Sequence, residues 1–505
     1  MNPDVLVVGA GPSGLAAAAE LALHGAKVRL VEARSDRAGQ SRAIVVQPRT
    51  LELFDRRGLA AELRLRAFRS NQVLRHAPGH PPVAVRLDTG ISDSRFPGLL
   101  WVPQNETEDV LTQHLHNLGV RVERQTELTG LRQESEHVTA TLQHADGSSE
   151  QVRAQYLIGA DGVHSAVRRL AGISFEGGTY EQSFLVADLH VDGLPDAESL
   201  HLFARGRAIA TFMPLRHPAP WRLLLVELDN PGDQQPTLAD LERQSWIWEQ
   251  LPLLLHDPIW VSRFQAHHRM AAHFRQGRVF LAGDAAHVHS PAGGQGMNTG
   301  LQDAWNLGWK LALVSTGHAR AELLDSYEAE RMAVARELLR TTDRLFAGMV
   351  SANPLIRAAR ATLFPFLTSV AGRNPRIGKR AAQLTSMLRI AYPDSPIVAG
   401  SAERLRPRPG ERLPDLKLPD GGWLHERLTG PGHHLLLCRS YDDNEIGQLL
   451  RTYDGLITLS RVPDGTLGGG AVLVRPDGYV AFRGGDDLAP LKAYLARWLL
   501  PSVRA

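Results

Sequence analysis

The chain opens with short apolar runs separated by a glycine-rich segment. Val5–Val8 is apolar, Gly9–Gly14 is rich in glycine, Leu15–Leu23 is rich in alanine, and Lys27–Val31 is again largely apolar. Short apolar runs next to glycine are typical of buried strands, and an alanine-rich stretch favours a helix. This order predicts a strand, a tight turn, a helix and a second strand.

The pattern then changes twice along the chain. Loops and helices are expected up to about residue 100, followed by a helix over Thr107–Leu118 and a strand that begins at Arg121–Glu123. Alternating elements of this kind favour a mostly parallel sheet. Between residues 173 and 273 the chain is β-rich, with candidate strands at Phe184–Val191, Ile209–Met213 and Arg222–Leu228. We therefore expect a second sheet inserted into the first domain.

The last part of the chain predicts a separate small domain. An apolar run returns at Arg278–Ala286, and a buried helix is expected over Asn298–Ser315. Residues 392–419 are dense in proline, which regular elements tolerate poorly, so this stretch is interpreted as a linker. Beyond it the pattern predicts an α/β unit with strands at His434–Cys438, Gly455–Leu459 and Ala471–Val474 and a closing helix at Asp487–Leu499.

Composition excludes several classes of protein. The 505 residues suggest two or three domains, and 43% hydrophobic with 22% charged residues describes a globular chain. With 56 basic against 54 acidic residues, a nucleic-acid partner is not expected. The single cysteine, Cys438, excludes an intramolecular disulfide, and we expect it to be a buried apolar residue. No signal segment or membrane-spanning run is recognised, so the expectation is a soluble cytoplasmic protein with no membrane partner and no metal.

The glycine-rich turn matches the G-x-G-x-x-G fingerprint of dinucleotide-binding proteins. In this motif the first glycine makes the turn, the second admits a pyrophosphate, and the third lets helix and strand pack closely. Glu32 ends the second strand, where its carboxylate can accept hydrogen bonds from the ribose hydroxyls of an adenosine. The residues assigned to the cofactor here are Gly9, Ala10, Gly11, Pro12, Ser13, Gly14 and Glu32.

Two further motifs resemble those of the flavoprotein aromatic hydroxylases. Tyr156–Ser165 matches the "DG" motif of that family, and Val279–His287 matches its "GD" motif. Pro291 and Gly293–Asn298 continue the match, followed by Asp303–Ala304, Asn306–Leu307 and Trp309–Leu311. Ala471–Ala481 resembles the end of the thioredoxin-like domain of larger members, among them phenol and polyketide hydroxylases. The resemblance covers nearly the whole chain. It implies that the dinucleotide is FAD.

The resemblance also implies a role for individual residues. Asp284 would bond the ribityl chain, as would Gln104, and backbone amides after Pro291 and at a helix start would face the pyrimidine end of the flavin. Glu32, Ala33 and Arg34 correspond to the ribose motif, Arg42 to an arginine of the pyrophosphate and nicotinamide nucleotide, and Leu128 to a backbone contact with adenine. The remaining positions are Asp161, Gly283, Gly294, Gly296, Met297 and Asn298.

Two residues allow two interpretations each. Arg49 matches the family at the flavin site, but it would serve equally as an ion-pair residue at a helix start. His287 suggests a base, but the better interpretation is a packing histidine. No catalytic residue is assigned, because the cofactor carries the chemistry.

The fold expected from the motifs is α/β with three parts. Residues 1–172 and 274–391 would form a discontinuous Rossmann-like FAD-binding domain, and residues 173–273 an inserted β-rich substrate domain with a mixed sheet. Residues 392–419 would be the linker, and residues 420–505 a thioredoxin-like α/β domain. Its lack of a C-x-x-C pair excludes thiol–disulfide chemistry.

The function implied is hydroxylation of an aromatic ring. NAD(P)H would bind transiently near Arg42 and Asp161 and reduce the flavin, and O2 would then form a flavin C4a-hydroperoxide that transfers oxygen to a phenol or aromatic polyketide. The expected protein is a monomer or homodimer. The alternatives are an FAD-dependent reductase or dehydrogenase and a flavin-binding protein without turnover. A flavin-dependent halogenase fits poorly, because Trp246–Pro252 has the wrong spacing and no lysine lies between Lys27 and Lys310.

Overall fold

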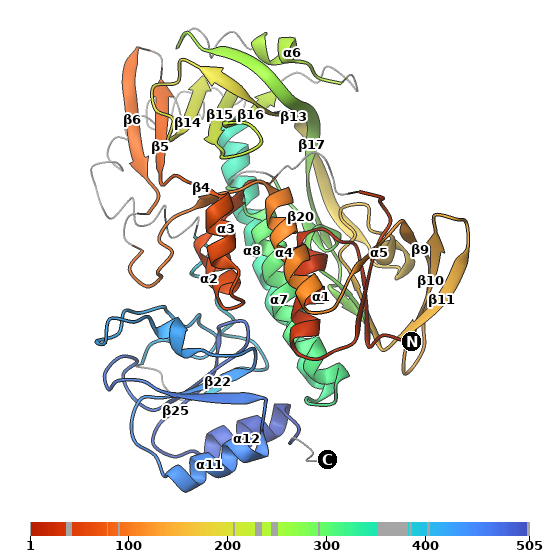
Figure 1. Ribbon diagram of the computed structural model, residues 1–505, viewed down its shortest axis with the longest axis vertical. Coiled ribbons are helices and arrows are strands. Elements are labelled where there is room, and N and C mark those ends of the chain that lie inside the picture. The colour runs from red at the N-terminus through yellow and green to blue at the C-terminus, as the bar shows by residue number, and fades with distance from the viewer. Residues whose placement is uncertain are drawn as a thin grey trace.

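The computed structural model divides into three regions along its long axis. In the middle, Figure 1 shows the region that contains the predicted dinucleotide-binding turn, and this region is named the nucleotide-binding half after that prediction. A large sheet lies at one end of it and a C-terminal unit, coloured blue, at the other. The structure describes residues 2–36, 43–77, 79–88, 91–205, 208–227, 235–243, 251–290, 293–350, 382, 386–400 and 405–501.

The nucleotide-binding half is organised around a six-stranded sheet. Its central strand β1 (Val5–Val8) pairs in parallel with β2 (Val28–Glu32) and β12 (Tyr156–Gly159), and of its described strands only the edge strand β18 (Arg275–Gln276) runs antiparallel, in agreement with the mostly parallel sheet that was predicted. The order is β18 (Arg275–Gln276), β19 (Val279–Leu281), β12 (Tyr156–Gly159), β1 (Val5–Val8), β2 (Val28–Glu32) and β8 (Val122–Arg124).

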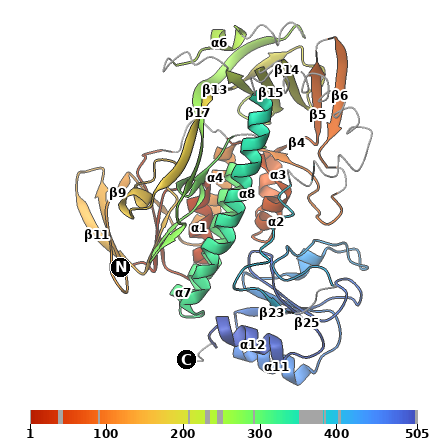
Figure 2. The same cartoon turned by 180° about the vertical axis from the view of Figure 1, so that it is seen from behind.

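Helices cover this sheet. Helix α1 (Pro12–Leu23) packs against both α4 (Gln104–Asn117) and α7 (Gly296–Ser315). The contact with α7 is close because a side chain at Gly308 would meet Glu20 at 2.7 Å. The sequence did not predict the long helix α8 (Asp325–Val350), which runs from beside α7 to the large sheet in Figure 2. The shorter helices are α2 (Pro48–Asp55), α3 (Ala60–Arg66) and α5 (Ala166–Leu170).

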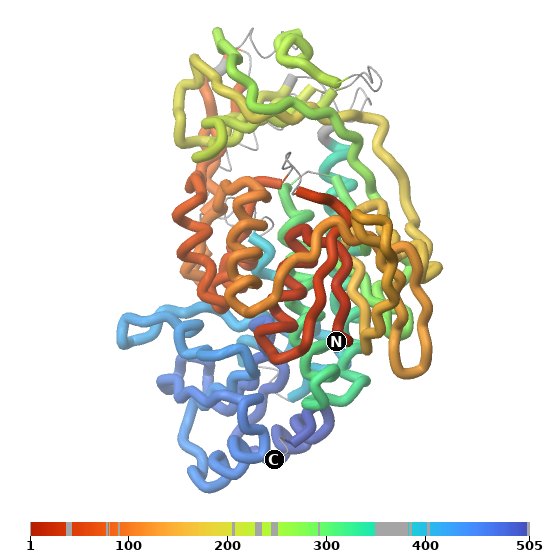
Figure 3. Tube along the Cα trace, turned by 45° about the vertical axis from the view of Figure 1, so that its right-hand side comes forward, coloured from red at the N-terminus to blue at the C-terminus, as the bar shows by residue number. Residues whose placement is uncertain are grey.

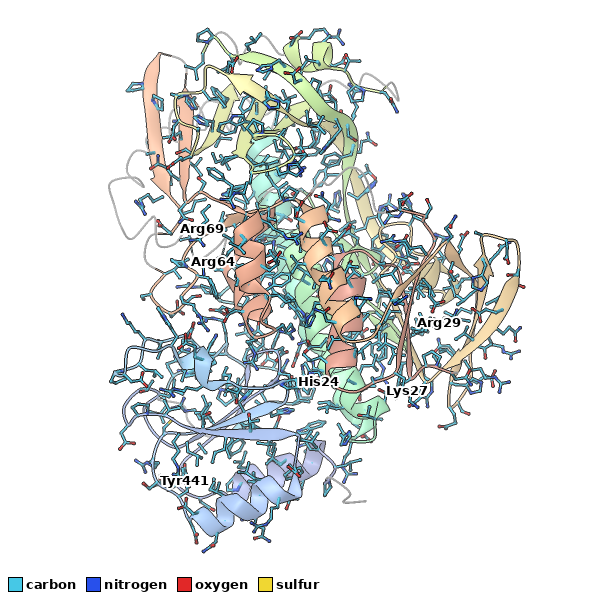
Figure 4. The ribbon with its side chains drawn as sticks, viewed as in Figure 1. His24, Lys27, Arg29, Arg64, Arg69 and Tyr441 are labelled. Atoms are coloured by element: carbon cyan, nitrogen blue, oxygen red, sulfur yellow. The ribbon has the colours of Figure 1, made fainter. Side chains whose placement is uncertain are left out.

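Two small sheets flank the central one. Strands β9 (Thr126–Gln133), β10 (Val138–His144) and β11 (Ser149–Ala154) form an antiparallel sheet. Arg29 of β2, labelled in Figure 4, donates to Glu123 of the neighbouring strand β8 at 2.8 Å and to Glu150 of β11, and the second contact connects the central sheet to this small sheet. The second small sheet has the order β3 (Val45–Val46), β7 (Leu100–Trp101) and β4 (Phe68–Arg69).

The large sheet is wider than the sequence suggested. Two of its strands, β5 (Gln72–Ala77) and β6 (His80–Arg86), come from the stretch expected to contain only helices and loops. The tube in Figure 3 shows this early excursion from the nucleotide-binding half to the large sheet. The other strands, in sheet order, are β20 (His287–Val288), β17 (Leu254–Ala271), β13 (Phe175–Asp192), β16 (Trp221–Glu227), β15 (Ala208–Pro214) and β14 (Leu200–Arg205).

The two faces of the large sheet bury different apolar clusters. Phe212 belongs to a cluster that includes Leu241 of α6 (Leu238–Glu242). The neighbouring Met213 belongs to a cluster on the opposite face with Ile44 and Val45, which come from the nucleotide-binding half. The alternation of side chains along β15 therefore directs one residue away from that half and the next toward it.

The C-terminal unit is a five-stranded mixed sheet with two helices. Its order is β21 (Ala399–Gly400), β25 (Val480–Gly484), β24 (Ala471–Val474), β22 (His433–Leu437) and β23 (Ile457–Arg461), with helices α11 (Asp443–Thr452) and α12 (Ala489–Trp498). Cys438 is buried after β22, and burial raises the pKa of its thiol. Because β21 and Leu413 pack into this unit, it begins before residue 420.

The core of the C-terminal unit is continuous with α7. Trp309 and Leu313 of α7 belong to the same apolar cluster as Leu435 and Leu495. Figure 1 shows the blue unit below α2 and beside the end of α7. Over the residues described, no helix is both long enough and apolar enough to span a bilayer.

Candidate active site

The fingerprint turn is fixed by close contacts of its backbone. Gly9 has a φ of +102°, donates to the Val31 carbonyl at 2.8 Å, and would carry a side chain 2.4 Å from the Ala160 carbonyl. A side chain at Gly14 would lie 1.8 Å from the Gly9 carbonyl. At Gly11 a side chain would meet nothing within 4 Å. The protein itself thus requires the first and third glycines, whereas the second faces open space at the start of α1, as a pyrophosphate site requires.

Glu32 points its carboxylate back at this turn. Its Oε2 accepts the Ala10 amide at 2.8 Å, and its Oε1 accepts the amide and Nε of Arg34, each at 3.1 Å. Burial alone would raise the pKa of Glu32, but these hydrogen bonds outweigh it and lower the pKa. Each carboxylate oxygen keeps acceptor capacity for a ribose hydroxyl. Ala33 and the side chain of Arg34 lie in solvent beside it.

Leu128 and Gln104, the positions expected at the adenine and the ribityl chain, lie in two different elements. Leu128 is a buried residue inside β9, which follows β8 after one residue. Gln125, three residues earlier, has a φ of +54° and donates its amide to the Arg34 carbonyl at 3.3 Å. Gln104 begins α4, and its side chain donates to Glu108 at 2.8 Å. Arg42 and Pro291 lie outside the described residues.

Asp161 of the DG motif holds the start of α5. Its carboxylate accepts the Ser165 hydroxyl at 2.5 Å and the Val167 amide at 3.1 Å. Burial raises the pKa of this carboxyl group. Ser165 in turn caps the helix by accepting the Arg168 amide at 2.9 Å. The motif therefore fixes a loop at the carboxyl end of β12, next to the fingerprint.

Arg168 joins the DG and GD motifs, and the sequence did not reveal this role. Its guanidinium donates to the carbonyls of Ala285 and Val163, each at 2.8 Å, and lies 3.8 Å from the centre of the Phe175 ring. An arginine on the first turn of a helix capped by Ser165 was the only signal available. Its partner Ala285 lies too far along the chain for local patterns to predict the contact.

The GD motif packs directly on the fingerprint helix. Gly283 has a φ of +62°, and a side chain there would lie 2.3 Å from Oγ of Ser13. A side chain at Gly300 of α7 would lie 2.4 Å from the same atom. Ser13 therefore occupies a niche between two glycines, which brings the starts of α1 and α7 together. Asp284 is exposed, whereas Gly283 and Ala285 beside it are buried.

Asp303 is the buried anion that organises this region. It accepts the Gly283 amide at 3.1 Å, Nε2 of His287 at 2.7 Å and Nε of Arg331 at 2.6 Å. Burial alone would raise the pKa of Asp303, but Arg331 and His287 lower it to about 2. His287 is itself buried and bonded to this carboxylate, which is the geometry of a packing histidine. No role was predicted for Asp303 or Arg331.

Asn298 fixes the first turn of α7 against the segment that precedes α2. Its Oδ1 accepts the Gln47 amide at 2.9 Å, and its Nδ2 donates to the carbonyls of Val45 at 2.8 Å and Gly294 at 3.0 Å. Gly294 has a φ of +61° and would carry a side chain 3.3 Å from Val45. The amides of Gly296 and Met297 lie in the first helical turn, where no intrahelical acceptor exists and no side chain caps the helix.

Arg49 lies in the first turn of α2 and is fully buried. It donates to Glu52 at 2.9 Å within α2 and to the Asp477 carbonyl of the C-terminal unit at 2.5 Å. Its guanidinium also lies 4.7 Å from the centre of the Tyr479 ring. The structure therefore agrees with the ion-pair interpretation of Arg49.

The geometry suits an extended dinucleotide. The start of α1 faces open space at Gly11, Glu32 lies at one end, and the uncapped start of α7 lies close by through the Ser13 niche. Helix starts attract negative charge, which both a pyrophosphate and a reduced flavin carry. Among the residues described, no cluster of histidine, cysteine and acidic side chains is arranged to bind a metal.

Two protein-family models match different parts of the chain. Residues 2–342 match the model of an FAD binding domain. Residues 406–501 match the model described as "Aromatic-ring hydroxylase, C-terminal". The two matches together include every motif discussed above.

Individual relatives agree over nearly their full length. The chain is 36% identical to 6-methylpretetramide 4-monooxygenase of Streptomyces rimosus, covering 96% of this chain and 91% of the relative. An anhydrotetracycline hydroxylase structure from Streptomyces rimosus superposes with a TM-score of 0.82 at 33% identity and covers 100% of both chains. A complex of aklavinone-11 hydroxylase with FAD and aklavinone superposes with a TM-score of 0.78 at 27% identity, covering 98% of each chain.

Proposed function

The chain belongs to the family of FAD-dependent aromatic-ring hydroxylases, and we propose that it hydroxylates a phenolic or fused polyketide ring with electrons from NAD(P)H and oxygen from O2. The single observation that carries this proposal is the close packing around Ser13, where the fingerprint helix α1, the GD motif and α7 contact one another. A reductase would share the fingerprint. The C-terminal match and the named relatives favour hydroxylation.

The described residues can be assigned to the parts of FAD. Gly9–Gly14 would receive the pyrophosphate, Glu32 with Arg34 the ribose, and Leu128 the adenine. Asp284 and Gln104 would bond the ribityl chain, while the segment from Gly294 to Asn298, which leads into α7, would face the pyrimidine ring. Bound FAD supplies the redox chemistry and activates O2. Asn298 and Asp303 keep the surrounding loops in place by the hydrogen bonds described above.

The apolar face of the large sheet is the proposed substrate side. Met213 and Leu215 lie there with Ile44, Val45 and Trp101, next to Gly294 at the start of α7. An apolar wall at this position excludes water and suits a fused aromatic ring. The similarity to 6-methylpretetramide 4-monooxygenase and to aklavinone-11 hydroxylase supports this choice of substrate class.

Electrons are proposed to enter without a second nucleotide domain. NAD(P)H would dock transiently near Arg42 and Asp161, reduce the flavin and leave. The C-terminal unit is proposed to be a thioredoxin-like domain with a structural role, because its one cysteine is buried and has no thiol partner.

The test is NAD(P)H oxidation in air by purified holoenzyme, with and without a phenolic polyketide. The proposal predicts slow oxidation alone and fast oxidation with the aromatic ligand. An NAD(P)H oxidation rate that is the same with and without the ligand, with no hydroxylated product, would indicate a reductase. Stopped-flow measurements on fully flavinylated Arg42→Ala should show slower reduction by NAD(P)H and unchanged reoxidation by O2. Equal slowing of both half-reactions would contradict the docking role of Arg42.

A further inference from the structure

The turn Arg475–Gly478 joins β24 to β25 and inserts into the nucleotide-binding half. It belongs to the stretch that resembles the end of the family's C-terminal domain, and the proposed chemistry gives it no role. Arg475 and Asp477 are nevertheless almost completely buried. Burying two charged side chains is unfavourable unless other charged or polar groups compensate them.

Helices α7 and α8 supply that compensation. Arg475 donates to the two carboxylate oxygens of Glu330 on α8 at 2.5 and 2.8 Å and to Asp477 at 2.9 Å. Glu330 also accepts Nζ of Lys310 at 2.8 Å and Nδ2 of Asn306 at 2.6 Å, both from α7. Asn306 reaches Asp477 as well, at 3.1 Å. The two cations and two anions balance, and every one of these residues is buried.

The same turn also holds the start of α2. The Asp477 carbonyl accepts the Arg49 guanidinium at 2.5 Å. Gly478 has a φ of +80°, and a side chain there would lie 3.3 Å from Nη2 of Arg49. This glycine therefore meets both a conformational and a steric requirement. Arg49 is two residues from Gln47, whose amide binds Asn298 on the first turn of α7.

These contacts close a ring through both helices. From the turn, one path runs through Arg49 and α2 to Gln47, and the other through Asn306 and α7 to Asn298. The paths meet at the Gln47–Asn298 hydrogen bond. Asn298 and Asn306 are about 12 Å apart along the helix axis, at 1.5 Å per residue. The start of α2 and the Asn298–Asn306 part of α7 therefore connect the C-terminal turn to the expected pyrimidine end of the flavin.

We propose that Arg475 and Asp477 are positioning residues of the flavin site. They hold α2 and α7 at the spacing at which Gln47 binds Asn298 and the segment from Gly294 to Asn298 presents its backbone to the isoalloxazine. The C-terminal domain thus completes the cofactor site without touching the cofactor. This inference rests on the proposed placement of FAD.

The test compares two buried aspartates that have the same chemistry in different places. Asp477→Asn removes the charge at the turn. The matched control is Asp188→Asn, because Asp188 is also buried and bonded by an arginine fork, from Arg222 at 2.6 and 2.7 Å, but belongs to β13 of the large sheet. For each purified variant, the FAD dissociation constant is measured by titrating the apoprotein, with the flavin absorption spectrum and the apoprotein Tm recorded alongside.

Asp477→Asn should weaken FAD binding roughly tenfold, within the usual range for residues that couple to a site through a network. It should also shift the visible flavin bands. Asp188→Asn should lower Tm but leave the FAD constant and the spectrum unchanged. If Asp477→Asn does not fold, Arg49→Lys is the milder variant, because it keeps a positive charge beside Glu52 but loses the Nη2 hydrogen bond to the Asp477 carbonyl. It should change the spectrum in the same direction.

Two results would overturn the inference. One is an Asp477→Asn or Arg49→Lys protein with wild-type FAD affinity and spectrum. The other is an equal loss of FAD affinity in Asp188→Asn, because the effect would then follow general stability. Failure of the wild-type protein to bind FAD at all would instead refute the proposed function.

Discussion

The nucleotide-binding half and the large sheet are both built on apolar strands, but their candidate binding surfaces differ. The first depends on backbone contacts, and the second on apolar side chains. In the nucleotide-binding half, Gly9, Gly14 and Gly283 make backbone contacts that a side chain would block. In the large sheet, neighbouring residues such as Phe212 and Met213 simply alternate between two apolar clusters.

The difference explains why one region can be recognised and the other cannot. A backbone site admits only glycine at particular positions, so its sequence signature is narrow. An apolar wall accepts many residues of similar volume, so the same fold can suit different rings. The cofactor is therefore identifiable from this sequence, and the individual substrate is not.

The largest effect is expected within the fingerprint. Gly14→Val should prevent folding, because its side chain would overlap the Gly9 carbonyl. Gly11→Ala should fold with an unchanged apoprotein Tm, since nothing lies within 4 Å of the new methyl group. It should nevertheless weaken FAD binding by roughly 1–3 kcal/mol, the usual result of an added methyl group in a tight contact. Measurements of Tm and FAD titrations test both variants. Wild-type FAD affinity in Gly11→Ala would contradict the proposed position of the pyrophosphate at this turn.

The next effect concerns the buried anion Asp303. Asp303→Asn should destabilise the protein by about 3–5 kcal/mol, because Arg331 would lose its buried partner. The pKa of Asp303 is lowered to about 2, so its stabilising contribution is complete above about pH 4 and is lost as the pH falls toward 2. Urea unfolding across this range should show a steeper acid loss in wild type than in the variant. Parallel curves would contradict the assignment.

In the large sheet, two neighbouring substitutions should separate stability from substrate binding. Phe212→Ala should cost about 3–5 kcal/mol of stability, as truncation of a buried phenylalanine usually does. Met213→Ala should mainly raise KM for the aromatic substrate and the fraction of NAD(P)H oxidised without product, with FAD affinity unchanged. Urea unfolding and product yield per NAD(P)H distinguish them. The opposite assignment of effects would mean that the substrate lies on the other face.

A smaller effect is expected at Asp284. Asp284→Ala should weaken FAD binding by about 1.5–3 kcal/mol, the contribution of a hydrogen bond to a charged group. Apoprotein stability should change little, because Asp284 is the exposed residue of its turn. Glu322→Ala, at an exposed position beyond α7, is the control and should bind FAD normally. Unchanged affinity in Asp284→Ala would argue against the placement of the ribityl chain.

The sequence identified those parts of the fold that depend on local pattern. The strand–turn–helix unit at Gly9–Gly14 and the helix after Asn298 lie where they were predicted, because glycine demands and apolar periodicity are local. Helix α8 is rich in alanine, glutamate, arginine and leucine, a composition that favours helix, so its signal is present in the sequence. Strand β6 contains Pro81 and Pro82, which suggest a loop but are tolerated at the edge of a sheet.

The contacts that the sequence did not reveal are all long-range. Arg168 binds Ala285, Arg331 binds Asp303, and Arg475 binds Glu330. Each pair is buried and joins separate elements, and no periodicity relates one partner to the other. Only the folded chain shows that Arg168 and Arg331 hold together motifs of the nucleotide-binding half and that Arg475 joins the C-terminal unit to α8.

Incorporation of labelled oxygen tests the central claim most directly. The holoenzyme is supplied with NAD(P)H, a phenolic polyketide and 18O2, and the product is analysed by mass spectrometry. A flavin-dependent aromatic hydroxylase must place one 18O atom in the new hydroxyl group, with FAD as the flavin released on denaturation. Hydroxyl oxygen derived from water, or a product oxidised without any added oxygen, would contradict this account of the protein.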